Sequence, residues 1–305
     1  MLGQSQTRTK TKSLNRQTHV EAAGYVGERG AGQVITRSLM YVVLVIGAVV
    51  SLFPFYYMFS AATHTSSEVL ALPPNLLPST HIFDNINKLI KDVHFDEAAR
   101  NSLVIAIMFT AITVTISSLA GYAFAKFRFK GSGLIFGIFL ATLMIPAQVT
   151  YVPLFKLMTA EGNPFGINLL GSYWAVLLPG LASPFGIFLM RQSMKNFPDD
   201  LLEAGRIDGA GEFEMFWRLV LPVMRPSLAA LAIFMFMTQW NSFFWPLVVQ
   251  VQTIPTAIGA LSGSSIIDYG GIMTGTSLSV LPILVVFLFL QREFISGALA
   301  GSVKG

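Results

Sequence analysis

The sequence predicts an all-α, polytopic membrane protein with six transmembrane helices. Charged residues make up 12% of the 305 residues and hydrophobic residues 53%, whereas soluble domains carry about 25% charged residues. A helix that crosses a bilayer needs about 20 apolar residues. Six intervals without Asp, Glu, Lys or Arg have room for at least one such helix each. These intervals are residues 38–67, 101–125, 131–155, 162–190, 226–267 and 269–291.

One transmembrane helix is predicted in each interval, at residues 38–58, 102–124, 134–155, 172–190, 227–248 and 272–290. Because their number is even, both termini are expected on the same side. Cytosolic loops are enriched in Lys and Arg. Of the 20 such residues, all but four lie in segments on the side of the termini, and the exceptions are Lys88, Lys91, Arg100 and Lys156. The prediction is therefore that both termini are inside the cell.

This topology divides the chain into a flexible cytosolic tail at residues 1–37, a six-helix transmembrane domain at 38–290 and a second cytosolic tail at 291–305. The first tail has no apolar core segment, so it is not a signal peptide. The predicted outer loops are residues 61–100, 157–171 and 249–271, and the inner loops are residues 126–130 and 191–226.

Composition also bears on several classes of site. The chain has no cysteine, which excludes disulfides and cysteine-bound metals. Its four histidines lack metal-ligand spacing and are expected to face solvent, so no metal site is predicted. The basic residues are dispersed and show no aromatic stacking pattern, so the positive net charge of +4 does not indicate nucleic-acid binding.

No acidic or basic residue lies at the centre of any predicted transmembrane helix. A charge there costs about 3 kcal/mol, and it usually has a function when it is present. Proton- or ion-coupled carriers normally contain such residues. Their absence predicts that the energy for transport does not enter through charged groups within the membrane. It also suits a neutral, polar substrate.

Polar side chains in the apolar helices are candidates for a substrate path. Thr113 and Ser117 share one face of the second helix, where close helix packing and a pore lining are both possible. Gln239, Trp240 and Asn241 in the fifth helix have amide and indole groups that suit sugar hydroxyls and rings, although an interfacial aromatic belt is the alternative. Gln148 is a similar candidate, with interhelical hydrogen bonding as its alternative.

The long inner segment at residues 191–226 is charged and interrupted by glycine. Asp200 and Glu203 have the spacing of a helix capping pair, which predicts a short helix over residues 201–207. Gly209 and Gly211 then permit a turn, because glycine adopts backbone conformations that other residues avoid. The segment is therefore predicted to contain two helices that meet at a glycine corner.

The second of these helices is predicted to begin near Glu212. Its apolar residues fall on one face, and they are Phe213, Phe216, Trp217, Val220 and Leu221. The first helix presents Glu203, Arg206 and Asp208 outward. Two interpretations remain open: the pair is a knob that inserts into a soluble partner, or it lies on the membrane surface.

The sequence EAGRIDGA at residues 203–210, followed by Leu221, Pro222 and Pro226, resembles the EAA loop of ABC importer permeases. That loop usually reads Glu-Ala-Ala, three residues, then Gly, and Gly205 here replaces the second alanine. The C-terminal sequence GALAGSVKG resembles the tail of maltose-type G permeases of carbohydrate importers. The Gln-Trp-Asn stretch of the fifth helix is also similar to that group.

The resemblance implies a type I ABC importer permease in a bacterial or archaeal cell membrane. The residues that would dock an ATPase subunit are Glu203, Ala204, Gly205, Arg206, Asp208 and Gly209. The tail residues Ser302, Val303, Lys304 and Gly305 would reach the interface of the ATPase dimer. A second homologous permease would complete a twelve-helix pore, and an extracytoplasmic sugar-binding protein would deliver the substrate.

The chain has no GxxxxGK[ST] phosphate-binding loop. It is therefore expected to be a transport subunit and not an enzyme, with ATP and Mg²⁺ bound by the partner ATPase. The predicted function is import of mono- or oligosaccharides. The alternatives are a permease of the same superfamily for a non-sugar solute and an ion-coupled secondary transporter.

Overall fold

The computed structural model describes residues 31–264 and 266–302, and every element within these ranges is helical, which confirms the predicted all-α fold class. The chain divides into two units, residues 1–57 and 58–305. The described residues of the first unit belong to helix α2 (Ala31–Ala61), which begins at Ala31 and not at the predicted residue 38. Residues 1–30 of the predicted N-terminal tail lie outside the described residues.

Three helices are long and apolar enough to cross a membrane without interruption. They are residues Thr36–Ala61 of α2, all of α5 (Phe95–Lys126) and residues Tyr269–Glu293 of α16 (Tyr269–Ser302). The other candidate spans within the described residues are bent pairs of helices. The count of six is reached only if each bent pair forms one span, so the six-span topology stays a prediction.

The first bent pair consists of α6 (Ser132–Thr142) and α7 (Ala147–Met158), which meet at 100°. The second pair joins α8 (Tyr173–Leu177) and the 3-10 turn η1 (Leu178–Gly180) to α9 (Pro184–Lys195) at 48°.

The third bent pair joins residues Glu212–Val223 to α13 (Arg225–Trp240) at 82°. Its first part contains three elements in succession: α11 (Glu212–Met215), the π-helical turn η2 (Phe216–Val220) and α12 (Leu221–Val223). The predicted fifth helix ends early, at Trp240, and α14 (Phe244–Val248) follows as a separate helix.

Prolines lie at these breaks. Pro146 is the N-cap of α7, Pro184 is the first residue of α9, and Pro226 lies in the first turn of α13. Proline has no backbone N–H and clashes with the preceding turn, so it begins a helix more readily than it continues one. At α9 the side chain of Ser183 also accepts a hydrogen bond from Gly186 N at 3.1 Å, which satisfies one of the free N–H groups of the first turn.

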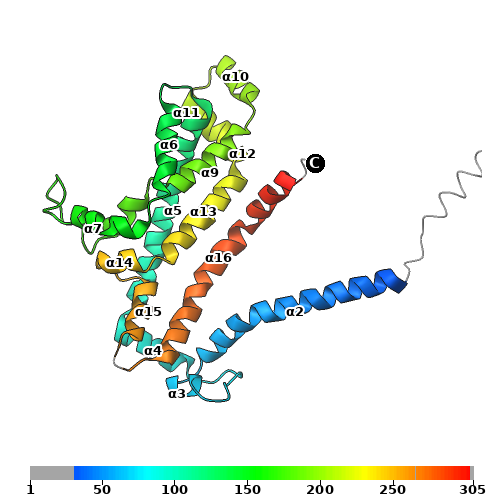
Figure 1. The fold of residues 1–305 in the computed structure, drawn as a ribbon, viewed down its shortest axis with the longest axis vertical. Helices are drawn as coiled ribbons and strands as arrows, with labels where there is room; N and C mark the ends of the chain where they lie inside the picture. The colour runs from blue at the N-terminus through cyan, green and yellow to red at the C-terminus, as the bar shows by residue number, and fades with distance from the viewer. Residues whose placement is uncertain (1–30, 265, 303–305) are drawn as a thin grey trace, which may run out of the picture. The chain divides into compact units, whose positions relative to one another are not determined.

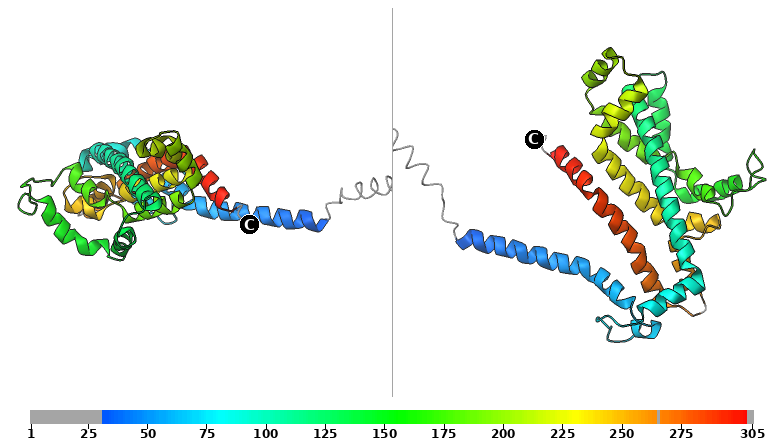
Figure 2. Two further views of the ribbon diagram at one scale, coloured as in Figure 1. Left: turned by 90° about the horizontal axis from the view of Figure 1, so that it is seen from above. Right: turned by 180° about the vertical axis from the view of Figure 1, so that it is seen from behind.

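In the second unit, α5 extends from one end to the other (Figures 1 and 2). One end, called here the α10 end, carries α10 (Asp199–Ile207) and α11. The opposite end, the α4 end, carries α3 (Ser66–Val69), α4 (Ile82–Val93) and α15 (Ile254–Ser262). Two apolar clusters form the core, and side chains of α5 contribute to both.

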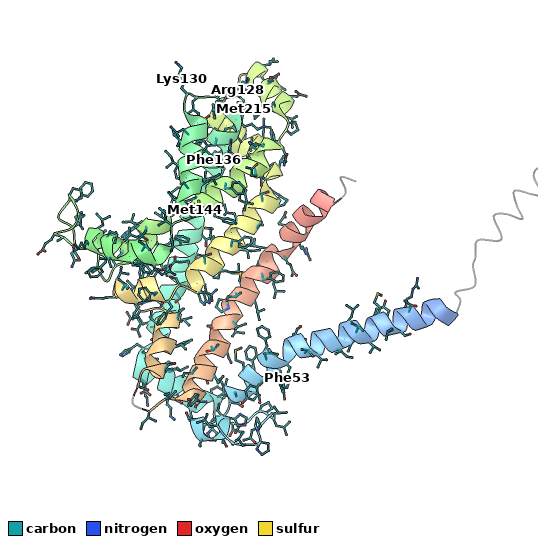
Figure 3. The ribbon with its side chains drawn as sticks, viewed as in Figure 1. Phe53, Arg128, Lys130, Phe136, Met144 and Met215 are labelled. Atoms are coloured by element: carbon teal, nitrogen blue, oxygen red, sulfur yellow. The ribbon has the colours of Figure 1, made fainter. Side chains whose placement is uncertain are left out.

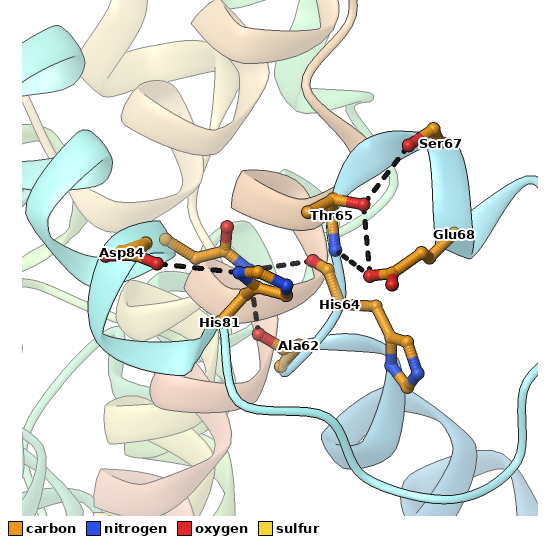
Figure 4. Close-up of polar contacts among 8 residues, drawn as sticks. Ala62, His64, Thr65, Ser67, Glu68, His81 and Asp84 are labelled. Atoms are coloured by element: carbon orange, nitrogen blue, oxygen red, sulfur yellow. Dashed lines mark hydrogen bonds and ion pairs between the residues drawn. The ribbon is translucent and has the colours of Figure 1, made fainter.

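The α4 end is held together by buried hydrogen bonds (Figure 4). Asn85 of α4 is buried, and its Nδ2 donates to Ala62 O at 3.0 Å and to His64 O at 2.9 Å. Thr274 of α16 donates to the same carbonyl of Ala62 at 2.8 Å. The prediction that the histidines face solvent is wrong for His64, which is 4% exposed and has its Nδ1 at 2.9 Å from Ser60 O.

Candidate functional site

The predicted docking motif lies on and directly after α10, at the α10 end of the second unit (Figure 1). Five of the six predicted docking residues are exposed there, and these are Glu203, Ala204, Arg206, Asp208 and Gly209. Ile207 between them is 86% exposed. Sequence reasoning missed this isoleucine as a contact residue, and its signal was an apolar side chain within a polar motif.

The sixth predicted docking residue, Gly205, is buried on the other side of α10. A Cβ atom at Gly205 would lie 2.9 Å from Met215 Sδ and 3.3 Å from Leu219 Cδ1. Leu202 is buried on the same side. Gly205 therefore allows α10 to pack closely on the segment Glu212–Val223, and it does not belong to the exposed face.

The start of α10 differs from the prediction. The helix begins at Asp199 with Pro198 as its N-cap and without a side-chain cap, so the predicted capping pair of Asp200 and Glu203 is wrong. Asp199 and Asp200 occupy the first turn, where the helix dipole favours negative charge. Pro198 has no side-chain acceptor to offer the free N–H groups of the first turn.

The end of α10 confirms the predicted turn at Gly209, but Gly211 has an ordinary extended conformation with a φ of −73°, so the special backbone conformation predicted for it is wrong. Gly209 has a φ of +83°, a left-handed conformation that glycine adopts without strain. Its N–H donates to Arg206 O at 3.1 Å, and the N–H of Ala210 donates to Gly205 O at 2.9 Å. These two bonds satisfy carbonyls that the end of the helix leaves free, in the arrangement of a Schellman motif.

An ion pair also joins the two helices that meet at the glycine corner. Arg206 Nε donates to Glu212 Oε1 at 2.8 Å, which joins the last turn of α10 to the first residue of α11. This hydrogen bond raises the pKa of the Arg206 guanidinium above its ordinary value. Arg206 is thus engaged within the chain and still lies on the exposed face of α10.

The segment Glu212–Val223, called the arm below, was predicted to bury one regular helical face. Phe216 and Val220 are buried as expected, but Phe213 and Trp217 are exposed, and Met215 is buried in their place. The π-helical turn over Phe216–Val220 interrupts the 3.6-residue periodicity within the arm, but Phe213 and Met215 precede it, so it does not account for their exposure and burial.

Three candidates for the substrate path lie in helix packing contacts. Trp240 is 3% exposed, and its Nε1 donates to Ser279 O of α16 at 3.1 Å. Thr113 and Ser117 are buried. A Cβ atom at Gly186 of α9 would lie 2.4 Å from Ser117 Oγ, so the two helices approach closely here. The hydroxyls of Thr113 and Ser117 have no hydrogen-bond partner within residues 31–264 and 266–302, so packing at this crossing does not rest on them.

The remaining path candidates are accessible. Gln148 and Asn241 are exposed, and Gln239 is partly buried. Asn241 Nδ2 donates to Met237 O at 2.8 Å, which leaves its side-chain oxygen available. Among the predicted tail residues, Ser302 is the last residue of α16. Val303, Lys304 and Gly305 lie outside the described residues.

The described residues thus form a bundle of apolar helices with α10 exposed at one end. The family model described as "Binding-protein-dependent transport system inner membrane component" matches residues 113–296. The chain belongs to this family, and it is a permease subunit of a binding-protein-dependent ABC importer, located in the membrane.

Two curated relatives illustrate the similarity. The chain is 38% identical over 270 residues to the lactose transport system permease protein LacG of Rhizobium radiobacter, with 87% of this chain and 96% of the relative covered. It is 34% identical over 269 residues to the sn-glycerol-3-phosphate transport system permease protein UgpE of Yersinia pestis bv. Antiqua (strain Antiqua), with 84% and 94% covered.

A solved structure shows the same fold. It is a chain of a bacterial ABC transporter involved in the import of the acidic polysaccharide alginate. The TM-score is 0.71 at 21% sequence identity, and the match covers 88% of this chain and 99% of that chain. The fold of the described helices is thus that of an ABC importer permease.

Proposed function

We propose that this permease subunit imports sugars, that it forms one half of a two-permease pore, and that α10 docks into an ATPase subunit. The exposed face of α10 carries the docking proposal, because it presents charged residues and the apolar side chain of Ile207 together. Interfaces combine such an apolar anchor with polar contacts around it. The name of the LacG relative and the resemblance of the C-terminal sequence to sugar permeases support the substrate class.

In the proposed mechanism, the partner ATPase subunits hold ATP and Mg²⁺, and their closure displaces residues 201–211. The transmembrane helices then open the pore outward to receive the sugar from the binding protein. Return of the ATPases to their open state brings the pore back to an inward-open state. This chain contributes the docking face, the arm and half of the pore, in the orientation with both termini inside.

The docking proposal is tested with Glu203→Lys in the complete complex of permeases, ATPase subunits and binding protein in proteoliposomes. Reversing the charge at an interface contact should lower ATP-driven uptake by about tenfold or more, because each 1.4 kcal/mol of lost interaction is about tenfold. The matched control is Glu161→Lys, which reverses an exposed charge in the predicted outer loop of residues 157–171. Uptake at the wild-type rate by Glu203→Lys in an intact complex would refute docking through this face.

The UgpE relative favours one alternative, a polar phosphorylated solute. Uptake of radiolabelled lactose in competition with sn-glycerol-3-phosphate, measured with the chain's own binding protein, separates the two. Inhibition by sugars alone supports the sugar proposal. Uptake that needs an ion gradient and continues without ATP would instead support an ion-coupled carrier.

A further inference from the structure

The last residue of α5, Lys126, is almost entirely buried although it carries a charge. Its side chain is 5% exposed, and Nζ donates to Phe197 O and to Asp199 Oδ1, each at 2.6 Å. The amine also lies 5.8 Å from the centre of the Phe197 ring. Asp199 is the first residue of α10, so this amine joins the end of α5 to the start of α10.

Lys126 lies in the last turn of α5, where the helix dipole favours a cation, but its amine lies at the first residue of α10, where the dipole opposes one. A buried charge is also costly unless it is paired and hydrogen-bonded. Lys126 meets these requirements only through its two partners in the loop. The same hydrogen bond lowers the pKa of the Asp199 carboxyl below its ordinary value.

A second contact joins α5 to the other end of α10. Tyr122 lies one turn before Lys126, is buried, and donates from its hydroxyl to Glu212 Oε2 at 3.2 Å. The other oxygen of Glu212 accepts from Arg206 in the last turn of α10. The ring of Tyr122 packs on Phe216 of the arm at 5.3 Å between ring centres. Both ends of α10 are therefore connected to the final turn of α5.

Besides the covalent link from α9 through residues 196–198, α10 connects to the transmembrane helices through the arm and through α5, and these two paths differ in regularity. The arm contains a π-helical turn and meets α13 at 82°, so a displacement of α10 must pass a bend. By contrast, α5 is one uninterrupted helix over Phe95–Lys126. At its far end, Ser102 Oγ accepts from Ile254 N at 2.8 Å, and Asn101 Nδ2 donates to Gln252 O at 3.0 Å.

We propose that Lys126 and Tyr122 form a latch that makes α5 and α10 move as one body, so that α5 carries the docking movement directly to the α4 end. The proposal rests on the proposed docking role of α10. Lys126 and Tyr122 are positioning residues, because they act through α10 and touch neither solute nor nucleotide. Without the latch, ATP hydrolysis continues but drives fewer transport events.

The test measures solute transported per ATP hydrolysed in proteoliposomes that contain the complete complex. Lys126→Met and Tyr122→Phe should each lower this ratio by about fivefold or more, the lower range of coupling between distant sites. Co-purification of the ATPase subunits should not change. Lys126→Arg should retain most of the coupling. The matched controls are Arg128→Met and Lys130→Met, which remove exposed cations at the same end (Figure 3) and should leave the ratio at the wild-type value.

A charge exchange tests the pair itself. Lys126→Asp combined with Asp199→Lys should recover coupling relative to either single variant. Because this chain has no cysteine, Lys126→Cys with Asp199→Cys allows a further test with a short bifunctional thiol reagent. Cross-linking should restore transport, since the two helices are proposed to move together, and a cross-link that stops transport would overturn the latch.

Three outcomes separate the latch from a stabilising contact, from the docking proposal and from the proposed function. If Lys126→Met lowers ATP hydrolysis and transport in equal proportion, these residues only stabilise the loop and the latch is wrong. If Glu203→Lys uncouples transport but Lys126→Met keeps the wild-type ratio, docking stands and the latch fails. If the ATPase subunits do not bind the permease and Glu203→Lys has no effect on uptake, the proposed function itself fails.

Discussion

Helices α5 and α9 approach each other closely at Gly121, and the substitution Gly121→Ala tests this contact. A Cβ atom there would lie 2.6 Å from Met190 Cβ and 2.9 Å from Arg191 N. Non-bonded carbon atoms prefer about 3.5–4.0 Å, so the helices would have to separate by roughly 1 Å. The neighbouring atoms belong to the backbone or are fixed to it, so rotation of a side chain cannot relieve the contact.

The expected cost follows from two opposing effects. Overpacking a close contact costs up to about 3 kcal/mol, and replacing glycine by alanine in a helix returns about 1 kcal/mol. The net loss is therefore about 2 kcal/mol, equivalent to roughly 4–8 °C in the thermal midpoint at about 2–4 °C per kcal/mol. The assay is thermal unfolding of the purified complex in detergent.

The matched control is Gly137→Ala, also inside a helix, where nothing lies within 4 Å of the added Cβ. This variant should be as stable as wild type or slightly more stable. The reasoning is refuted if Gly121→Ala and Gly137→Ala have the same midpoint, because the close approach would then carry no energetic weight.

Three further predictions concern the α4 end, the fifth-helix candidate and the latch. Asn85→Ala removes two buried hydrogen bonds and should cost about 1–3 kcal/mol in thermal unfolding, whereas the exposed Asn87→Ala in the same helix should change little. Trp240→Phe should lower stability by about 1 kcal/mol through the lost bond to α16 and leave the KM of uptake unchanged, and an altered KM would restore the substrate-path interpretation. The pKa of Asp199 is lowered from 3.8 by its bond to Lys126, so the stabilisation by this pair is complete above that pH and disappears only as pH falls through the lowered pKa. Coupling should therefore be flat between about pH 6 and 8 in the proteoliposome assay, and a titration within that range would contradict the assignment.

Helix α10 illustrates which structural features the sequence predicts and which it does not. A short helix was predicted over residues 201–207, and α10 covers Asp199–Ile207. The glycine corner was also predicted, since the left-handed conformation of Gly209 depends on its own chemistry. The orientation of Gly205 was not predictable, because a small residue suits both an exposed face and a close packing contact.

The transmembrane helices were likewise predicted only in part. The uncharged intervals indicated membrane spans and their prolines indicated kinks, but neither gave the bends of 48° to 100° that separate three pairs of helices. Proline is tolerated in membrane helices when neighbouring groups satisfy the freed backbone, so its effect depends on those neighbours. Periodicity likewise misplaced Trp217, which lies within a π-helical turn that departs from the 3.6-residue spacing.

The sequence by itself determined the all-α membrane class, the glycine-cornered motif that led to the family, and the absence of charges from the apolar intervals. These properties depend on composition and on neighbours along the chain. Only the tertiary structure decided which polar residues meet, since Lys126 and Asp199 are 73 residues apart and Tyr122 and Glu212 are 90 apart. Such pairs form because α5 ends where α10 begins in space, and the crossing of helices, not their local pattern, places them together.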